Sequence, residues 1–245
     1  MVEIKITFYG YLTDFFKNVD EKITRLVTIK RRSVKDFIES MGVPHTEVGR
    51  ILVDGKGVDF TFIIQEKCYI EVYPFFLSDI DRMAHIQSEE LRFICDVHIG
   101  TLARRLRLLG MDTRFDKNWQ DEKLAEIAET QDRVLLTRDR HLLMRKNVTK
   151  GLYIRSLIPD IQVREVIKRF DLKLKCRPFT RCLVCNGLLI SLDKNTDLFQ
   201  SNREKIPPKV QAWCRNYSIC RLCGKIYWEG THFEKLKKMV NRYLS

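Results

Sequence analysis

The fold class follows from Leu91-Arg92-Phe93-Ile94-Cys95-Asp96, whose pattern returns in Arg133-Val134-Leu135-Leu136-Thr137-Arg138-Asp139. Each is a short apolar run that ends in an acid and is followed by residues with a helical period. This pattern predicts parallel strands joined by crossover helices, and therefore an α/β fold with a parallel sheet. The two acids then lie at the carboxyl ends of strands, where open α/β sheets bind their ligands.

Asp96 and Asp139 each have two interpretations. A lone aspartate after a strand caps the next helix well, whereas two such strand ends in one small sheet bring carboxylates together. Paired carboxylates without a serine or cysteine nucleophile suggest a divalent metal ion and phosphate chemistry. The apolar strand before Asp96 favours a metal ligand, and Arg138 and Arg140 on either side of Asp139 favour a phosphate site.

The segments after these acids carry further candidates. Asp121 lies three residues after Asn118, a spacing that fits a capping box as well as a metal ligand. The helix expected after Asp96 has apolar side chains on one face and arginines on the other. Such cations can meet phosphates, although cation-rich helix faces are more often only solvated. The candidate RNA-binding residues are Arg104, Arg107, Arg138 and Arg140.

The charge of the chain is uneven along its length. The 245 residues have a net charge of +12, divided as 0 over residues 1–78, +4 over 79–175 and +8 over 176–245. The rising basic excess fits a polyanionic partner for the second and third segments. An ordinary basic surface explains it almost as well.

The chain lacks targeting signals in its sequence pattern. No apolar stretch approaches the roughly 20 residues of a membrane span, and the N-terminus does not resemble a signal peptide. We therefore expect a cytoplasmic protein without membrane association. Four of the eight cysteines form two Cys-x-x-Cys pairs, which indicate metal ligands in a reducing compartment.

Residues 1–78 have the pattern of a small α+β domain. Strand signals at 2–8 and 23–29 are followed by a helix that Ser33 caps, and then by further strands up to residue 74. This order resembles the ubiquitin-like β-grasp. Its sulfur-carrier members act through a free C-terminal Gly-Gly, whereas here the last strand continues into Phe75-Phe76-Leu77-Ser78. We therefore predict a binding or positioning module, followed over 79–90 by a linker whose apolar spacing also fits a docked helix.

Four blocks of the sequence resemble the PIN-like ribonucleases of the mut-seven C-terminal family, and they occur in that family's order. The resemblance covers roughly residues 91 to 235, and an N-terminal ubiquitin-like domain is a known arrangement in the family. The neighbourhood of the first acid, Cys95 and Val97-His98, departs from the family's pattern. The blocks are Phe93–Asp96 with Gly100–Arg104 and Leu106–Thr113, then Leu135–Arg140, then Arg181–Asn186, and finally Cys220–His232.

The resemblance implies that Asp96, Asp121 and Asp139 are catalytic and bind Mg²⁺ or Mn²⁺. It implies hydrolysis of RNA phosphodiester bonds by in-line attack of a metal-bound water, which leaves products with a 5′ phosphate. A fourth acidic ligand stays open. The available acids are Asp112, Asp116 and Asp160.

Cys182-x-x-Cys185 and Cys220-x-x-Cys223 each fit a knuckle that points two thiolates at one tetrahedral Zn²⁺. Four thiolates leave no open coordination position, so the ion would be structural. The long gap between the pairs predicts a projecting loop around Ile206-Pro207-Pro208. Cys176, Cys214 and His232 lack paired spacing and are weaker ligand candidates.

Basic and aromatic residues alternate around this zinc ribbon. The combination suits single-stranded RNA, which offers phosphates and unstacked bases. A small ribbon also needs aromatic residues as its core, and we favour that role for most of them. Apolar spacing over residues 232–244 predicts a terminal helix.

The sequence thus predicts an α/β protein of three parts: a ubiquitin-like β-grasp domain over 1–78, a PIN-like nuclease domain over 91–175 after the 79–90 linker, and a zinc ribbon with a C-terminal helix over 176–245. The leading hypothesis is a metal-dependent ribonuclease with structural zinc, catalytic magnesium or manganese and single-stranded regions of RNA as its partner. The alternative is a non-catalytic RNA-binding adaptor whose acids are helix caps. A third hypothesis is a protein that recruits a protein partner through its β-grasp domain.

Overall fold

The computed structural model describes residues 2–17, 20–75 and 91–245. The chain forms two compact units: unit 1 comprises Met1–Glu89 with Trp119–Arg155, and unit 2 comprises Glu90–Asn118 with Ser156–Ser245. The linker or docked helix expected over 79–90 lies outside the described residues. Because each unit combines separate segments of the chain, the domain boundaries 1–78, 91–175 and 176–245 stay predictions. None of the described helices is both long and apolar enough to cross a membrane.

The N-terminal part of unit 1 contains a β-grasp-like sheet. In β1 (Val2–Tyr9), alternate side chains enter the core, among them Ile4 and Ile6. β1 lies between an antiparallel and a parallel neighbour, and the strand order is β2-β1-β7-β4-β5. The other strands are β2 (Lys22–Ile29), β4 (Val48–Val53), β5 (Lys56–Val58) and β7 (Cys68–Pro74).

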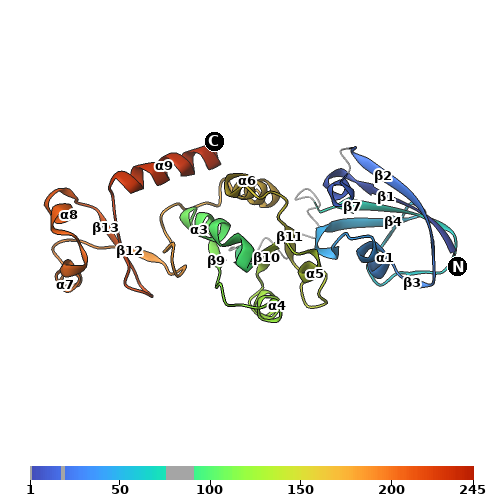
Figure 1. The fold of residues 1–245 in the computed structure, drawn as a ribbon, viewed down its shortest axis with the longest axis horizontal. Helices are drawn as coiled ribbons and strands as arrows, with labels where there is room; N and C mark the ends of the chain where they lie inside the picture. Colours follow the sequence, from blue (N-terminus) through green and yellow to red (C-terminus); the bar gives the residue numbers. More distant parts are fainter. Residues whose placement is uncertain (1, 18–19, 76–90) are drawn as a thin grey trace. The chain divides into compact units, whose positions relative to one another are not determined.

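Helix α1 (Val34–Ser40) lies against one face of this sheet (Figure 1). The Ser33 hydroxyl accepts the backbone N–H of Asp36 at 3.0 Å, so the predicted cap begins the helix. Phe37 and Ile38 join the core that the apolar residues of β1 form. The short strand β3 (Arg32–Ser33) and the 3₁₀ helix η2 (His45–Glu47) contact α1, and β3 pairs with β6 (Ile63–Ile64). A second 3₁₀ helix, η1 (Gly10–Phe16), contacts β1 and β7. The sequence predicted neither 3₁₀ helix.

Four strands form the central sheet, and β9 and β11 lie at its two ends. β8 pairs in parallel with β9, and β10 pairs in parallel with β11. All four residues of β10 are buried, as expected of a parallel strand covered on both faces. The predicted parallel strands before Asp96 and Asp139 are therefore confirmed. The strands are β8 (Arg92–Cys95), β9 (Asp112–Arg114), β10 (Val134–Thr137) and β11 (Gly151–Tyr153).

Short helices connect these strands. In unit 2, η3 (Val97–Ile99) and α3 (Gly100–Leu108) join β8 to β9, and α6 (Pro159–Phe170) lies beside α3 (Figure 1). Gly110 has a φ of 84° after α3, and a Cβ atom there would clash with the carbonyl oxygen of Arg177. In unit 1, α4 (Asp121–Thr130) precedes β10, and α5 (Arg140–Leu143) follows it.

The C-terminal part of unit 2 is a three-stranded antiparallel sheet, β12 (Leu189–Ser191), β13 (Tyr217–Cys220) and β14 (Ile226–Trp228). The projecting loop predicted between the cysteine pairs is wrong, because Phe199 and Ile206 are buried in the ribbon's own core. The segment instead folds into α7 (Asp197–Gln200), η4 (Arg203–Lys205) and α8 (Pro208–Trp213).

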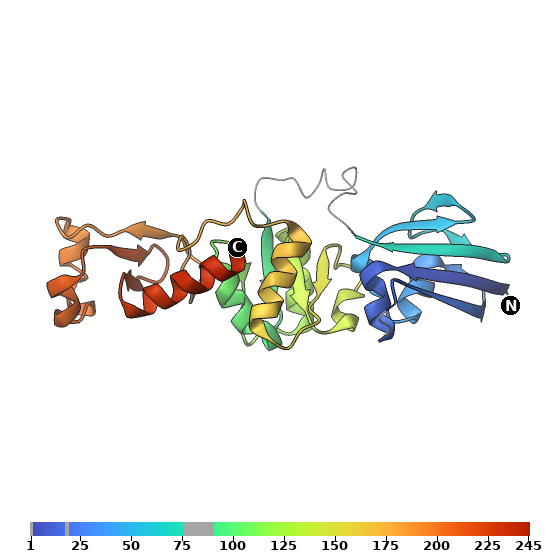
Figure 2. The same ribbon diagram turned by 90° about the horizontal axis from the view of Figure 1, so that it is seen from above.

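The chain ends in the predicted terminal helix, α9 (Thr231–Leu244), which is red in Figure 2. Its Tyr243 hydroxyl donates a hydrogen bond to Asp160 in α6. The ammonium group of Lys173 bonds to the carbonyl oxygen of Ser245 at 2.8 Å. These contacts attach the last turn of α9 to α6 and the residues that follow it.

Candidate functional site

Asp96 follows the last residue of β8 and is only 4% exposed. Its carbonyl oxygen accepts the N–H of Ile99 at 3.1 Å, which begins η3. Its side chain makes no capping hydrogen bond to η3, whose residues are all described. The helix-cap interpretation of Asp96 is therefore wrong, and the metal-ligand interpretation stays.

Asp121 is exposed and is the first residue of α4. Gln120, not Asn118, occupies the N-cap position, and the N–H of Asn118 bonds to the Asp116 carboxylate at 2.9 Å. The capping-box interpretation of the Asn118–Asp121 spacing is therefore wrong. As an acid in the first turn, Asp121 lies where the helix dipole favours negative charge.

Asp139 follows β10 and caps α5. Its Oδ1 accepts the backbone N–H of His141 at 2.7 Å and that of Leu142 at 3.4 Å. Its own N–H donates to the Thr137 hydroxyl at 2.9 Å, which fixes the backbone at the strand end. A carboxylate has about four acceptor sites on its two oxygens, so a cap through Oδ1 is compatible with cation binding.

The two arginines beside Asp139 have different surroundings. The Arg140 guanidinium lies over two rings of unit 1, 4.9 Å from the centre of Phe15 and 5.3 Å from that of Tyr153. Its Nη1 also donates to the Phe15 carbonyl at 3.3 Å. Arg140 therefore packs within unit 1, and Arg138 is half-buried.

The arginines of α3 also divide by position. Arg104 is exposed, in agreement with a cation that can meet solvent or phosphate. Arg105 forms an ion pair with Asp160 at 2.8 Å. Arg107 is 4% exposed, and Nε donates to the Thr113 carbonyl at 2.8 Å. The RNA-contact interpretation therefore fits Arg104 and does not fit the buried side chain of Arg107.

Arg107 connects α3 to the first cysteine knuckle. Its Nη1 donates to the carbonyl oxygens of Leu183 at 3.3 Å and Val184 at 2.8 Å, which lie between the two cysteines. Burial lowers the pKa of the guanidinium from its usual value, and the nearby thiols partly oppose this. Both acceptors are carbonyl oxygens of the knuckle, so Arg107 holds the knuckle's backbone against α3.

Asn186, which follows the first knuckle, makes a second connection. Its amide nitrogen donates to Asp112 Oδ1 at 2.8 Å, and its Oδ1 accepts the N–H of Thr113 at 3.0 Å. Asn186 has a φ of 71°, the left-handed conformation in which asparagine is tolerated. The knuckle is thus attached to α3 through Arg107 and to β9 through Asn186.

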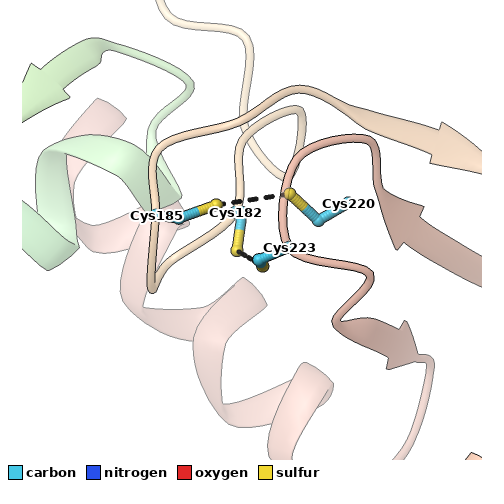
Figure 3. Close-up of side chains that lie close together, drawn as sticks. All are labelled: Cys182, Cys185, Cys220 and Cys223. Atoms are coloured by element: carbon cyan, nitrogen blue, oxygen red, sulfur yellow. Dashed lines mark hydrogen bonds between the residues drawn. The ribbon is translucent and has the colours of Figure 1, made fainter.

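The four paired cysteines gather between two loops, one before β12 and one between β13 and β14 (Figure 3). Their sulfur atoms all lie within 4.8 Å of one another. The Cys182 and Cys223 sulfurs are 3.7 Å apart, and those of Cys185 and Cys220 are 3.4 Å apart. The predicted grouping of these four residues is therefore confirmed.

This arrangement fits zinc. A tetrahedral ion with Zn–S bonds of about 2.3 Å holds its sulfur ligands about 3.8 Å apart, close to the spacing here. In each knuckle a backbone N–H bonds back to the first cysteine: Asn186 to Cys182, and Gly224 to Cys220, both at 3.0 Å. Four thiols with this spacing and two matching turns can hold one closed, structural zinc ion.

Tyr227 in β14 supports the cluster and was not predicted to do so. Its hydroxyl lies 3.1 Å from the Cys182 sulfur and accepts the N–H of Leu183 at 3.0 Å. Burial raises the pKa of Cys182, but hydrogen bonds from Tyr227 and from the knuckle's backbone lower it by more, so that the pKa falls to about 6. The thiolate that a metal needs is therefore favoured at this position.

The three acids that were open as a fourth ligand each have a local partner. Asp112 accepts from Asn186, Asp116 accepts from Asn118, and Asp160 pairs with Arg105 and accepts from Tyr243. The contacts of Asp112 and Asp160 join neighbouring elements within unit 2, and that of Asp116 is a local turn. The surroundings of these three acids therefore do not indicate which of them would be the fourth ligand.

Two family models match the chain. The model described as the Mut7-C RNAse domain matches residues 91–240, and the model described as Mut7-C ubiquitin matches residues 1–79. The two matches cover the central and C-terminal segments and the β-grasp sheet, respectively.

A human protein described as exonuclease mut-7 homolog is 33% identical over 107 residues, which are 41% of this chain and 12% of that protein. The chain thus spans only a small part of that relative. Among solved structures, a putative molybdopterin converting factor, subunit 1, from Pyrococcus furiosus has a TM-score of 0.24 and 16% identity, and the match covers 30% of this chain and 98% of that chain.

Proposed function

The chain belongs to the Mut7-C RNase domain family, and from that premise we propose that it is a metal-dependent ribonuclease whose acidic site consists of Asp96, Asp121 and Asp139. The observation that carries the proposal is the position of Asp96, a buried aspartate directly after the parallel strand β8. Open α/β sheets bind ligands at such strand ends.

The donor set supports magnesium or manganese. Asp96, Asp121 and Asp139 offer only carboxylate oxygens, which are the hard ligands that these ions prefer. Asp139 is oriented by its cap on α5 and by Thr137, so its carboxylate has a fixed direction. When bound, such an ion makes water more acidic and stabilises negative charge on phosphate oxygens.

The chain's own cations have distinct proposed roles. Arg104 on α3 and Arg138 at the end of β10 are the candidates for contact with RNA phosphates, because a guanidinium matches a phosphate with two parallel hydrogen bonds. Arg107 and Arg140 position the elements beside the site and are not offered as RNA ligands.

The zinc ribbon is proposed to be a module for single-stranded RNA. The exposed cation Arg221 lies within the second knuckle, and the exposed Lys225 follows it. The Trp213 side chain is largely exposed. Phosphate contacts and base stacking are the two interactions that unpaired RNA offers. Tyr217 and Tyr227 serve the ribbon's core and its cysteines instead. Reduced thiols in the knuckles support a cytoplasmic location.

The test is cleavage of labelled single-stranded RNA by the full chain with Mn²⁺, with Mg²⁺ or with a chelator. We expect cleavage only with the metal ions and products that carry a 5′ phosphate. Asp96→Asn removes a charged ligand without changing the size of the side chain, and should reduce the rate by about 10³-fold or more. RNA binding and the thermal unfolding midpoint should be retained.

Glu126→Gln is the matched control. Glu126 is an exposed acid on α4, like Asp121, and pairs with Lys123 at 3.0 Å. Its substitution should leave the cleavage rate at the wild-type value. A wild-type chain that binds RNA but cuts none with either metal ion would contradict the proposal.

That outcome would favour a non-catalytic RNA-binding adaptor. The capping role of Asp139 is the one observation on its side, because a structural cap needs no metal. Under the adaptor hypothesis Asp139→Asn changes stability alone, whereas under the nuclease hypothesis it abolishes cleavage.

A further inference from the structure

The β-grasp domain supplies a buried carboxylate to the end strand of the central sheet. Glu47 in η2 is 0% exposed, and its Oε1 accepts the backbone N–H of Tyr153 in β11 at 2.6 Å. Residues 135–137 of β10 pair with residues 151–153 of β11 on one side of that strand. The Glu47 carboxylate therefore accepts the backbone N–H of Tyr153, and β11 is an end strand of the sheet.

A second side chain of η2 satisfies a backbone acceptor in the same region. His45 Nε2 lies 2.8 Å from the carbonyl oxygen of Val148, and because a carbonyl only accepts, this nitrogen carries the hydrogen. The other ring nitrogen, Nδ1, lies 2.6 Å from the Glu39 carboxylate at the end of α1. His45 and Glu47 of η2 thus bind two backbone groups, the carbonyl of Val148 before β11 and the N–H of Tyr153 within it.

An arginine cluster extends this contact to the segment that carries Asp139. Arg155, two residues after β11, lies 3.6 Å from Glu47 and donates to Asp14 of η1 at 2.9 Å. Its guanidinium lies 5.2 Å from the centre of the Phe15 ring. The Arg140 guanidinium lies over the same ring, and Arg140 is the first residue of the helix that Asp139 caps.

Sheet edges and buried charges explain why such a contact matters. An unpaired strand edge exposes backbone groups that otherwise pair with other chains, and proteins cover such edges. A buried carboxylate is tolerated when it is hydrogen-bonded and paired with a cation, and its removal leaves the partners unsatisfied. Glu47 meets both requirements for β11.

We infer that the β-grasp domain is a built-in edge cap of the central sheet, and that Glu47 is a positioning residue that holds β11 and, through Arg155, Phe15 and Arg140, the helix after Asp139. Its partner is thus a strand of the same chain. The effect on cleavage rests on the proposed ribonuclease function, whereas the effect on β11 does not.

The test compares Glu47→Ala with Glu47→Gln in the full chain. We expect Glu47→Ala to speed hydrogen exchange of the Tyr153 amide by about tenfold or more and to lower kcat by a similar factor, with little change in KM. Glu47→Gln keeps an acceptor oxygen for that amide, so it should restore most of the exchange protection and part of kcat.

Val72→Ala is the matched control, because Val72 is fully buried in the β-grasp core and lies outside this contact. Val72→Ala should lower the unfolding midpoint but change neither the hydrogen exchange of the Tyr153 amide nor kcat. Phe15→Leu, which keeps an apolar side chain but removes the ring under both guanidiniums, tests the same contact if Glu47→Ala does not fold. We expect it to lower kcat.

If Glu47→Ala leaves the hydrogen exchange rate of the Tyr153 amide unchanged, the edge cap is overturned. It is also overturned if Val72→Ala raises that exchange rate as much as Glu47→Ala does. If Glu47→Ala does not fold, wild-type kcat in Phe15→Leu overturns it. A wild-type chain without cleavage activity contradicts the ribonuclease proposal, and the exchange comparison between Glu47→Ala and Glu47→Gln still decides on the edge cap.

Discussion

Arg107 shows at the residue scale how this fold uses a charge for structure. The guanidinium is buried and donates to the carbonyl oxygens of Thr113, Leu183 and Val184. Hydrogen bonds from a charged donor are stronger than neutral ones, and buried carbonyls left without a donor are costly. A side chain that sequence periodicity assigns to the solvent face of a helix is therefore a link between two parts of unit 2.

We predict that Arg107→Ala lowers the free energy of unfolding by about 2–4 kcal/mol, because three backbone acceptors lose their donor. Arg107→Lys keeps the charge but cannot reach all three acceptors, and should recover only part of the loss. Urea unfolding measures both. Arg104→Ala, the exposed neighbour on α3, is the control and should change stability by less than about 0.5 kcal/mol. Equal effects at the two positions would contradict the assignment.

Asp160 gives a pH-dependent prediction. The hydrogen bond from Tyr243 lowers the pKa of this carboxyl below its usual value, partial burial opposes that effect, and Arg105 adds to it. A lowered pKa in the folded state stabilises the fold above the unfolded pKa of about 3.9, and this contribution is lost as the pH falls through the folded pKa.

Asp160→Asn should therefore lower the free energy of unfolding by about 1 kcal/mol at pH 7, a modest effect because the carboxylate is half-exposed and solvent screens it. The difference from wild type should shrink below about pH 4. Unfolding curves at pH 7 and pH 3 test this. The same difference at both values would mean that charge is not the cause.

The sequence predicted the positions of Asp96 and Asp139 after parallel strands and the grouping of the paired cysteines, but not the surroundings of these residues. The role of the two acids as ligands stays a prediction. The roles of Glu47 and Arg107 depend on partners more than 70 residues away, and a local pattern carries no information on them. The capping box at Asn118 failed because the helix begins at Asp121, with Gln120 as its N-cap.

At the element scale, the first cysteine knuckle connects the ribbon to the sheet that carries Asp96. Arg107 and Asn186 bind the first knuckle to α3 and β9, so an ordered knuckle keeps these hydrogen bonds in place. Structural zinc sites contribute directly to folding, because the ligands are not held together without the ion.

We predict that the chain binds one zinc ion, and that removing it with a chelator speeds hydrogen exchange of the Thr113 amide by about tenfold or more. That amide donates to Asn186, which follows the first knuckle. Cys223→Ser should have the same effect. Cys68→Ser, in β7 and outside the cluster, should keep the zinc content and the exchange rate. Unchanged exchange after zinc loss would contradict the connection.

Elements with a clear period could be predicted, and short ones held by tertiary contacts could not. The strands before Asp96 and Asp139 are mostly apolar, and β1 alternates, so the sequence indicated their type. The helices α7 and α8 are only four and six residues long. Helices of this length are not stable alone, and those of the ribbon depend on the burial of neighbouring Phe199 and Ile206.

At the scale of the whole molecule, the two family models match consecutive segments of the chain. The ubiquitin-like model covers the β-grasp sheet, and the RNase-domain model covers β8 to the ribbon. The basic excess lies in the same central and C-terminal segments, where a polyanion is expected. The N-terminal segment is neutral, in agreement with a positioning role rather than RNA binding.

A crystal structure of the full chain with Mn²⁺, in which anomalous scattering locates the ion, tests whether Asp96 and Asp139 form the acidic site. We predict a manganese peak about 2.1 Å from carboxylate oxygens of Asp96 and Asp139, and its loss in Asp96→Asn. A peak bound elsewhere, or carboxylates of Asp96 and Asp139 too far apart to share an ion, would contradict the acidic site.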